Sequence, residues 1–109
     1  MLAESLLALS LVDVKPVETG LSAPTSVVAA PNGTLFVTEK EGRIVKIPRK
    51  GKATTWYRIR VSSEGEQGLL SMVRIDRTRF YAAYTDAKGA LQVSRFTKGG
   101  GQRKIIRIP

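Results

Sequence analysis

The residues best suited by sequence context to contact a small ligand are Glu66 and Gln67, near the middle of the chain. Gly65 and Gly68 bracket them, and glycine adopts backbone angles closed to other residues, so the turn can be tight and present both side chains outward. A carboxylate accepts hydrogen bonds and a primary amide both donates and accepts them, which suits a sugar hydroxyl. The same groups could instead satisfy the backbone of their own loop, which is the simpler interpretation. We treat both as candidate substrate-binding residues.

The kinds of catalysis open to this chain are few, because the chain contains neither cysteine nor histidine. This excludes disulfides, zinc sites of the usual type, and nucleophile–base pairs that use either residue. Glu39 and Glu41 lie two residues apart beside a predicted turn, which favours solvent exposure over a catalytic carboxylate pair. The aspartates are too scattered to form a calcium loop. We expect no catalytic residue and no metal site, and the sequence identifies no cofactor-binding residue.

Charge is unevenly distributed along a chain whose formal net charge is +9. Residues 1–42 carry two bases against five acids, and residues 43–109 carry sixteen bases against four acids. Such asymmetry fits either a solvated basic surface or a polyanion-binding one. Arginines at 58, 60, 74, 77 and 79 alternate with aromatic residues at 56, 57, 80 and 81, a pattern typical of single-stranded nucleic-acid binding. Aromatic residues also pack between sheets, and we favour that interpretation.

The sequence predicts short strands separated by turns, and these strands must position the candidate residues. The first set is expected at residues 25–30, 34–39, 43–47 and 54–61, with a tight hairpin at Pro31-Asn32-Gly33. In the last of these strands, alternation places Trp56 on one face and Tyr57 and Ile59 on the other. A leading strand near residues 11–17 is interrupted by Pro16.

A second set of strands follows the same plan, at residues 69–75, 79–85, 90–96 and 104–108. Aligning Ser26 with Ser71 separates the two inner strands by about 45 residues, in the range of propeller repeats. We predict an all-β fold of four-stranded antiparallel β-propeller blades, about two of them, in a single partial domain over residues 1–109. The first blade with its leading strand covers 11–63 and the second covers 64–109.

Two blades cannot close a ring, so each is expected to need a neighbour. Remaining propeller blades of a longer protein, or further copies of the chain, would supply it. No apolar run is long enough to span a membrane. Residues 1–14 faintly suggest a secretory leader but lack a basic start, so they are not a convincing signal peptide.

Four segments, in order, carry a resemblance to a known family. They are residues 20–26 (GLSAPTS), 31–39 with 42–44 (PNGTLFVTE, GRI), 65–70 (GEQGLL), and 84–86 with 93–96 (YTD, VSRF). Together they resemble the glucose/sorbosone dehydrogenase family, soluble quinoproteins built as six-bladed propellers. The similarity spans about residues 14–109. The family usually has glycine where Ser71 stands, and many members have glutamine at the position of Glu66.

The resemblance implies a function for the full-length relative. Such a protein oxidises an aldose by hydride transfer to pyrroloquinoline quinone (PQQ), with an associated calcium ion, in a periplasmic or secreted location. The loop at Glu66 and Gln67 would face the mouth of the central channel and contact the sugar. The family's catalytic base is a histidine beyond the second blade, and most contacts to the quinone and the calcium come from later blades.

This chain is therefore expected to be the N-terminal part of such an enzyme, inactive alone and without a cofactor of its own. The alternatives are a non-enzymatic β-propeller module that binds a ligand or self-assembles, and a basic nucleic-acid-binding β domain. Of these, nucleic-acid binding is the less favoured.

Overall fold

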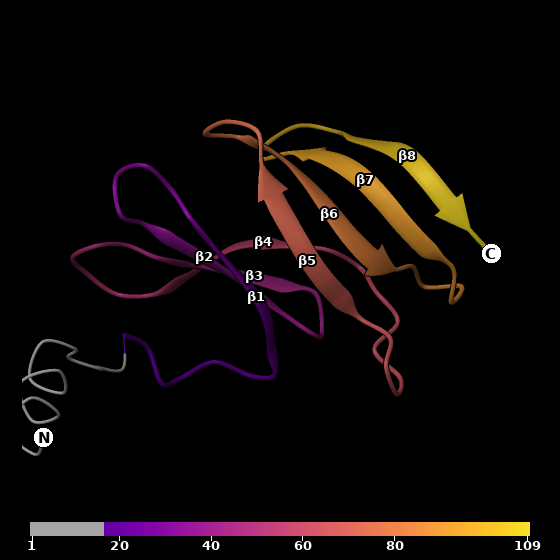
Figure 1. Ribbon diagram of the computed structural model, residues 1–109, viewed down its shortest axis with the longest axis horizontal. Helices are drawn as coiled ribbons and strands as arrows, with labels where there is room; N and C mark the ends of the chain where they lie inside the picture. Colours follow the sequence, from indigo (N-terminus) through magenta and orange to yellow (C-terminus); the bar gives the residue numbers. More distant parts are fainter. Residues whose placement is uncertain (1–16) are drawn as a thin grey trace, which may run out of the picture.

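A computed structural model describes residues 17–109, so the expected leading strand and the leader-like residues lie almost entirely outside the described part. Eight strands form two four-stranded antiparallel sheets (Figure 1). The first sheet contains β1 (Pro24–Ala29), β2 (Leu35–Glu39), β3 (Arg43–Ile47) and β4 (Thr54–Arg58). The second contains β5 (Leu69–Arg74), β6 (Arg79–Thr85), β7 (Leu91–Thr97) and β8 (Gln102–Ile108).

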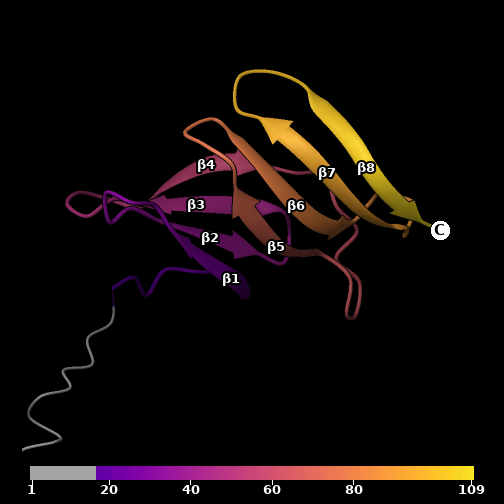
Figure 2. The same ribbon diagram turned by 45° about the horizontal axis from the view of Figure 1, so that its top comes forward.

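Both sheets are simple meanders in which each strand pairs with the next strand along the chain. Their inner strands, β1 and β5, lie side by side, and the sheets extend outward from them (Figure 2). This arrangement confirms the all-β prediction and its blade-like sheets. Within residues 17–109 there is no helix of the length and apolarity that crossing a bilayer needs.

The two sheets repeat the same irregularities. The register between inner strand and second strand shifts between Pro24 and Ser26 in the first sheet, and between Leu69 and Ser71 in the second. A second shift separates the third and fourth strands in both sheets, at 44/45 and at 93/94. Because bulges fix which face each later residue occupies, matching bulges establish residue-by-residue equivalence between the sheets.

The bulge on β4 also corrects one expectation. Alternation placed Trp56 and Ile59 on opposite faces, but both are buried in the same core and Tyr57 packs against it. The register shift on β3 between Ile44 and Val45 inserts an extra residue on β4, which breaks strict alternation. The strand also ends at Arg58, three residues before its predicted end at 61.

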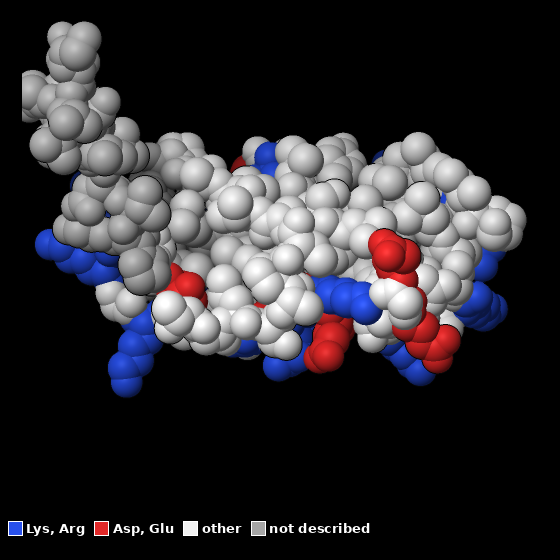
Figure 3. Space-filling model, turned by 60° about the horizontal axis from the view of Figure 1, so that its bottom comes forward, with Lys and Arg blue, Asp and Glu red and all other residues white. Residues whose placement is uncertain are grey.

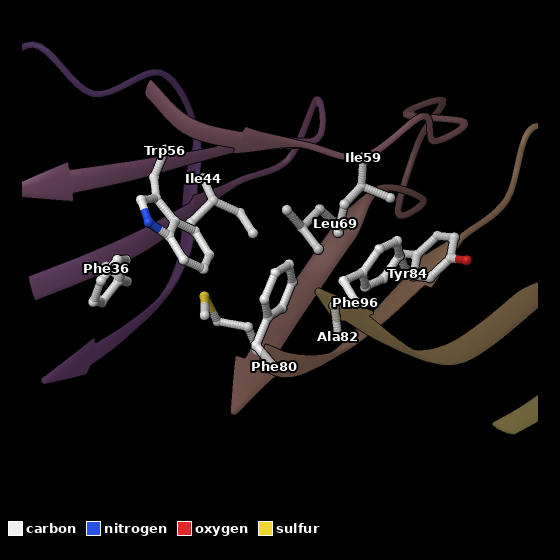
Figure 4. Close-up of a cluster of buried hydrophobic side chains, with 10 residues drawn as sticks. Phe36, Ile44, Trp56, Ile59, Leu69, Phe80, Ala82, Tyr84 and Phe96 are labelled. Atoms are coloured by element: carbon white, nitrogen blue, oxygen red, sulfur yellow. The ribbon is translucent and has the colours of Figure 1, made fainter. Parts of the chain in front are cut away.

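The main core lies between the sheets (Figure 4). Phe36 and Trp56 of the first sheet meet edge to face, with ring centroids 4.9 Å apart. Phe80 and Phe96 of the second sheet stack at 5.2 Å, and Trp56 lies 5.2 Å from Phe80. Of the four aromatic residues interleaved with arginines in the sequence, Trp56, Tyr57 and Phe80 pack between the sheets, as favoured, whereas Tyr81 is exposed. The aromatic layer joins the two halves of the molecule.

Each sheet has a front face and a rear face, defined here by how the sheets meet. The front face of the first sheet packs against the rear face of the second sheet. The front face of the first sheet presents Val28, Phe36 and Ile44. The rear face of the second sheet presents Met72, Phe80 and Ala82. The remaining two faces, the rear of the first sheet and the front of the second, have no sheet against them among residues 17–109.

Candidate functional site

The segment that carries Glu66 and Gln67 joins β4 to β5 and is held by both sheets. The amide of Leu69 donates a hydrogen bond to the carbonyl of Lys40 at 2.9 Å, and the amide of Thr85 donates to the carbonyl of Gly68 at 2.9 Å. Lys40 directly follows the first sheet's second strand, and Thr85 ends the corresponding strand of the second sheet. The loop therefore lies where the β2–β3 and β6–β7 turns meet, at the lower end in Figure 1.

Gly68 makes this close approach possible. Its φ is +148°, and a Cβ at this position would lie 2.4 Å from the carbonyl oxygen of Lys40. Any side chain would therefore displace the loop from the first sheet. The glycine bracket seen in the sequence thus positions the loop against its neighbour, in addition to shaping the turn.

Only one end of the side-chain amide of Gln67 is hydrogen-bonded within the described part of the protein. Its Oε1 accepts a hydrogen bond from Ser62 Oγ at 2.5 Å, and its backbone amide donates to the carbonyl of Glu64 at 2.9 Å. The Nε2 group has no hydrogen-bond acceptor among residues 17–109. The side chain is half-buried and therefore fixed, with its donor group unused.

Glu66 is exposed at the tip of the loop, and its carboxylate makes no hydrogen bond or ion pair to the described residues. Figure 3, turned so that this end comes forward, shows acidic and basic side chains close to one another. The loop thus offers a carboxylate acceptor next to the amide donor of Gln67, a combination that can hydrogen-bond a polyhydroxyl ligand.

Asp86 organises the neighbouring β6–β7 turn. Its carboxylate accepts hydrogen bonds from Gln92 Nε2 at 2.6 Å, the amides of Ala90 at 3.0 Å and Lys88 at 2.9 Å, and Arg107 Nε at 3.3 Å. These contacts, the Gln92 bond first among them, hold the pKa of Asp86 well below its usual range. The carboxylate is committed to its own turn and acts as a structural anion beside the loop.

A cluster of hydroxyl groups on β1 and β2 was missed from the sequence. Thr25 Oγ1 lies 2.7 Å from Thr38 Oγ1 and donates to the carbonyl of Leu69 at 2.8 Å, and Ser26 Oγ lies 2.5 Å from Thr38 Oγ1. The cluster links β1, β2 and β5 directly behind the loop. A threonine–serine pair opening an apolar inner strand was the available signal.

Glu39 departs from its expected place. Solvent exposure was predicted for Glu39 and Glu41, but only Glu41 is exposed, whereas Glu39 is 3% exposed on the rear face of the first sheet. Its carboxylate lies 3.3 Å from Arg43 Nη1 and accepts a hydrogen bond from the amide of Ser22 at 2.7 Å. An arginine partner and a backbone donor compensate the charge, which makes burial tolerable.

No family model matches the sequence, and no curated protein matches it either. An oxidoreductase of Thermus thermophilus described as a glucose dehydrogenase is 29% identical, with a TM-score of 0.70 over 85% of this chain and 30% of its own. The PQQ-bound aldose sugar dehydrogenase of Streptomyces coelicolor is 25% identical, with a TM-score of 0.73 over 86% and 33%.

These similarities define the class: the chain is an all-β partial propeller of about two blades. The resemblance predicted from the motifs, to PQQ-dependent glucose and aldose sugar dehydrogenases, is confirmed in three dimensions. The chain spans about a third of the length of either matched structure.

Proposed function

We propose that the chain forms the N-terminal blades, residues 11–63 and 64–109, of a propeller related to PQQ-dependent sugar dehydrogenases. In this proposal the loop bearing Glu66 and Gln67 forms one wall of an aldose site at the mouth of the central channel. The observation that carries it is the attachment of this loop to both sheets at the ends of their second strands, through Lys40 and Thr85. A periplasmic or secreted location follows from the same resemblance.

Sugar recognition by this wall would use two complementary groups. The unused Nε2 of Gln67 can donate to a ring or hydroxyl oxygen, and the carboxylate of Glu66 can accept from a hydroxyl group. Because Ser62 fixes the amide through Oε1, the donor is oriented before a ligand arrives, which reduces the entropy lost on binding. The wall would orient the aldose and leave the chemistry to other residues.

The residues near this wall do not fit the quinone or its calcium ion. No group of three acidic, histidine or cysteine side chains suited to a metal occurs within residues 17–109. The carboxylate of Asp86 already accepts hydrogen bonds within its turn, and the hydroxyl groups of β1 and β2 bond to one another. With no histidine in the sequence to serve as the base, we expect the chain to have no dehydrogenase activity alone.

The two faces that have no sheet against them support the need for further sheets. On the front face of the second sheet, the equivalents of Val28 and Phe36 are Val73, 63% exposed, and Tyr81, 39% exposed. On the rear face of the first sheet, Val37, Val45 and Ile47 are buried against Leu21, Leu35 and Ala53. An apolar groove of about 380 Å³ remains on this face, lined in part by the equivalents of Met72, Phe80 and Ala82, which are Val27, Leu35 and Val37. Each of these two faces therefore carries apolar residues at the positions whose equivalents are buried between the two sheets.

The second candidate function, a self-assembling module, rests on this same complementarity. The front face of one chain can pack on the rear face of the next, and such a head-to-tail contact closes a ring if its rotation permits. Three copies would supply the six blades that the resemblance implies. A solution mass near three chains would favour this candidate, and a monomeric mass would favour blades supplied by a longer protein.

Saturation-transfer NMR with glucose tests the proposed wall. We expect a transfer signal with the unmodified chain and its loss in Gln67→Ala and Glu66→Gln. Glu64→Gln is the matched control, because it removes a carboxylate from the same loop while retaining the backbone carbonyl bonded to Gln67. Equal signals from all variants would contradict the proposal. Quinone-dependent dye reduction by the chain itself would overturn the expected inactivity.

A further inference from the structure

A second hollow lies at the end of the molecule opposite the candidate sugar wall. It is a groove of about 460 Å³ between the sheets, bounded by the β1–β2, β5–β6 and β7–β8 turns. Phe36 and Trp56 form its apolar floor, and four basic residues surround it: Lys46, Arg74, Arg77 and Lys98.

No acidic side chain among the described residues lines this groove. Asp76, which adjoins Arg77 in the chain, is committed elsewhere. Its carboxylate lies 2.7 Å from Arg79 Nη2 and accepts hydrogen bonds from the amides of Thr78 and Arg79 at 3.1 and 2.8 Å. The bond from the Arg79 side chain is the main cause that lowers the pKa of Asp76 to about 2. The positive charge of the groove is therefore uncompensated by the described part of the protein.

Arg74 carries the most specific indication of a ligand. Its Nε is shielded from solvent and has no hydrogen-bond partner, the one such side-chain atom found within residues 17–109. Its guanidinium lies over the ring of Phe36, 5.0 Å from the centroid, which holds the group in place. A buried donor without an acceptor is costly, and charged donors more so, so an anion held in the groove beside this guanidinium would stabilise it.

Lys98 reaches the same groove from the β7–β8 turn. Its Nζ donates to the carbonyl of Trp56 at 2.9 Å and lies 5.6 Å from the indole ring. An ammonium group has three donors, so two remain for a ligand. Two fixed cations thus face the groove, Arg74 from the end of β5 and Lys98 from the β7–β8 turn, and Arg77 and Lys46 also line it.

We propose that this groove binds the phosphate group of a small molecule. A guanidinium fork beside an ammonium group matches the several acceptor oxygens and double charge of phosphate, and a chloride ion cannot use that geometry. The apolar floor beside the cations leaves room for the organic part of a phosphate ester. The site is separate from the sugar wall and depends on neither the quinone nor the ring.

The fluorescence of Trp56 reports on this site, because Trp56 is the sole tryptophan of the chain and lines the groove. Inorganic phosphate and glucose 6-phosphate are titrated separately, at constant ionic strength maintained with sodium chloride. We expect a saturable change in emission with phosphate that chloride alone does not produce. Tighter binding of the ester than of inorganic phosphate would assign the ligand as a phosphate ester, and equal or weaker binding would assign it as the free ion.

Substitutions localise the effect. Arg77→Gln removes an exposed charge with no hydrogen bond to the rest of the described chain, so it tests the groove without disturbing the core. We expect it to weaken phosphate binding about tenfold, and Arg74→Gln to weaken it more. Arg103→Gln, on the exposed outer strand, makes the same change in net charge and should leave binding unaltered. Equal weakening by Arg103→Gln, or an emission change that chloride reproduces, would overturn the proposal.

Discussion

The two sheets share one backbone plan but differ in what covers them. The rear face of the second sheet is buried by the first sheet, and it holds Phe80 together with a polar group formed by Tyr84, Gln92 and Ser94. The equivalent face of the first sheet has no sheet against it among residues 17–109: a small apolar cluster around Val45 is buried there, an apolar groove remains beside it, and the position of Tyr84 is taken by Glu39. The comparison shows that a repeated module keeps its bulges while its side chains adapt to the neighbour each face meets.

The largest expected difference concerns the aromatic layer. Phe80→Ala should lower the free energy of unfolding by about 3–5 kcal/mol, because it empties a fully buried position between the sheets. Leu35 occupies the equivalent position in the first sheet but is only half-buried, so Leu35→Ala should cost about 1 kcal/mol. Urea denaturation followed by circular dichroism measures both. Equal losses would mean that the rear face of the first sheet is covered in solution.

The next effect concerns the residue that precedes each inner strand. Gly68 and Ala23 are equivalent, since each accepts a backbone hydrogen bond at 2.9 Å from the end of the second strand of its sheet. Gly68→Ala should cost about 2–3 kcal/mol, because the new Cβ collides with the carbonyl of Lys40.

Ala23 already has a positive φ of 46°, so the reciprocal change Ala23→Gly should alter stability by less than about 1 kcal/mol. Thermal denaturation of both variants provides the measurement. A loss for Ala23→Gly as large as that for Gly68→Ala would refute the assigned steric cause.

A smaller effect is expected from the buried polar group of the second sheet. Tyr84 Oη lies 3.0 Å from Ser94 Oγ, donates to Gln92 Oε1 at 3.3 Å and accepts from Gln102 Nε2 at 2.7 Å. Tyr84→Phe removes these bonds and should cost about 1–2 kcal/mol. Tyr81→Phe, on the exposed front face, should change stability by less than about 0.5 kcal/mol in the same assay.

The smallest effect is a dependence on pH confined to the β5–β6 turn. Asp76 has a folded-state pKa lowered to about 2, chiefly by its bond to Arg79, so its contribution is fully present above about pH 4 and is lost as pH falls toward 2. The equivalent residue of the first sheet is Pro31, which cannot titrate. Carboxyl-carbon NMR should show Asp76 titrating near pH 2, and a midpoint near the ordinary value of about 4 would exclude the ion pair.

Much of the fold could be predicted because its signals are local. Gly33 with φ of 87° closes the first hairpin, and Gly89 with φ of 87° closes the turn between β6 and β7. Alternating apolar residues define most strands, and the spacing of Ser26 and Ser71 gives the repeat. The bulge on β4 escaped prediction, because a register shift depends on pairing with β3 and leaves no mark in one strand.

The candidate site was only partly accessible from sequence for the same reason. Glu66 and Gln67 were identified by their flanking glycines, but the contact of Gly68 with Lys40 joins residues from different sheets. The burial of Glu39 depends on Arg43 and on Ser22, which the turn brings together. The basic groove combines residues of β3, β5 and two turns that are far apart in the chain. The charge counts therefore indicated an excess of basic residues but not where they gather.

The meander order of the strands has a consequence for biosynthesis. Each sheet is completed by one uninterrupted stretch of chain, so pairing partners are close in sequence and their loops cost little entropy to close. During translation the first sheet can therefore form its hairpins before β5 leaves the ribosome. Its front face, with Phe36 and Trp56, stays uncovered until the second sheet emerges, and in that interval the nascent protein is most exposed to aggregation and to chaperone capture.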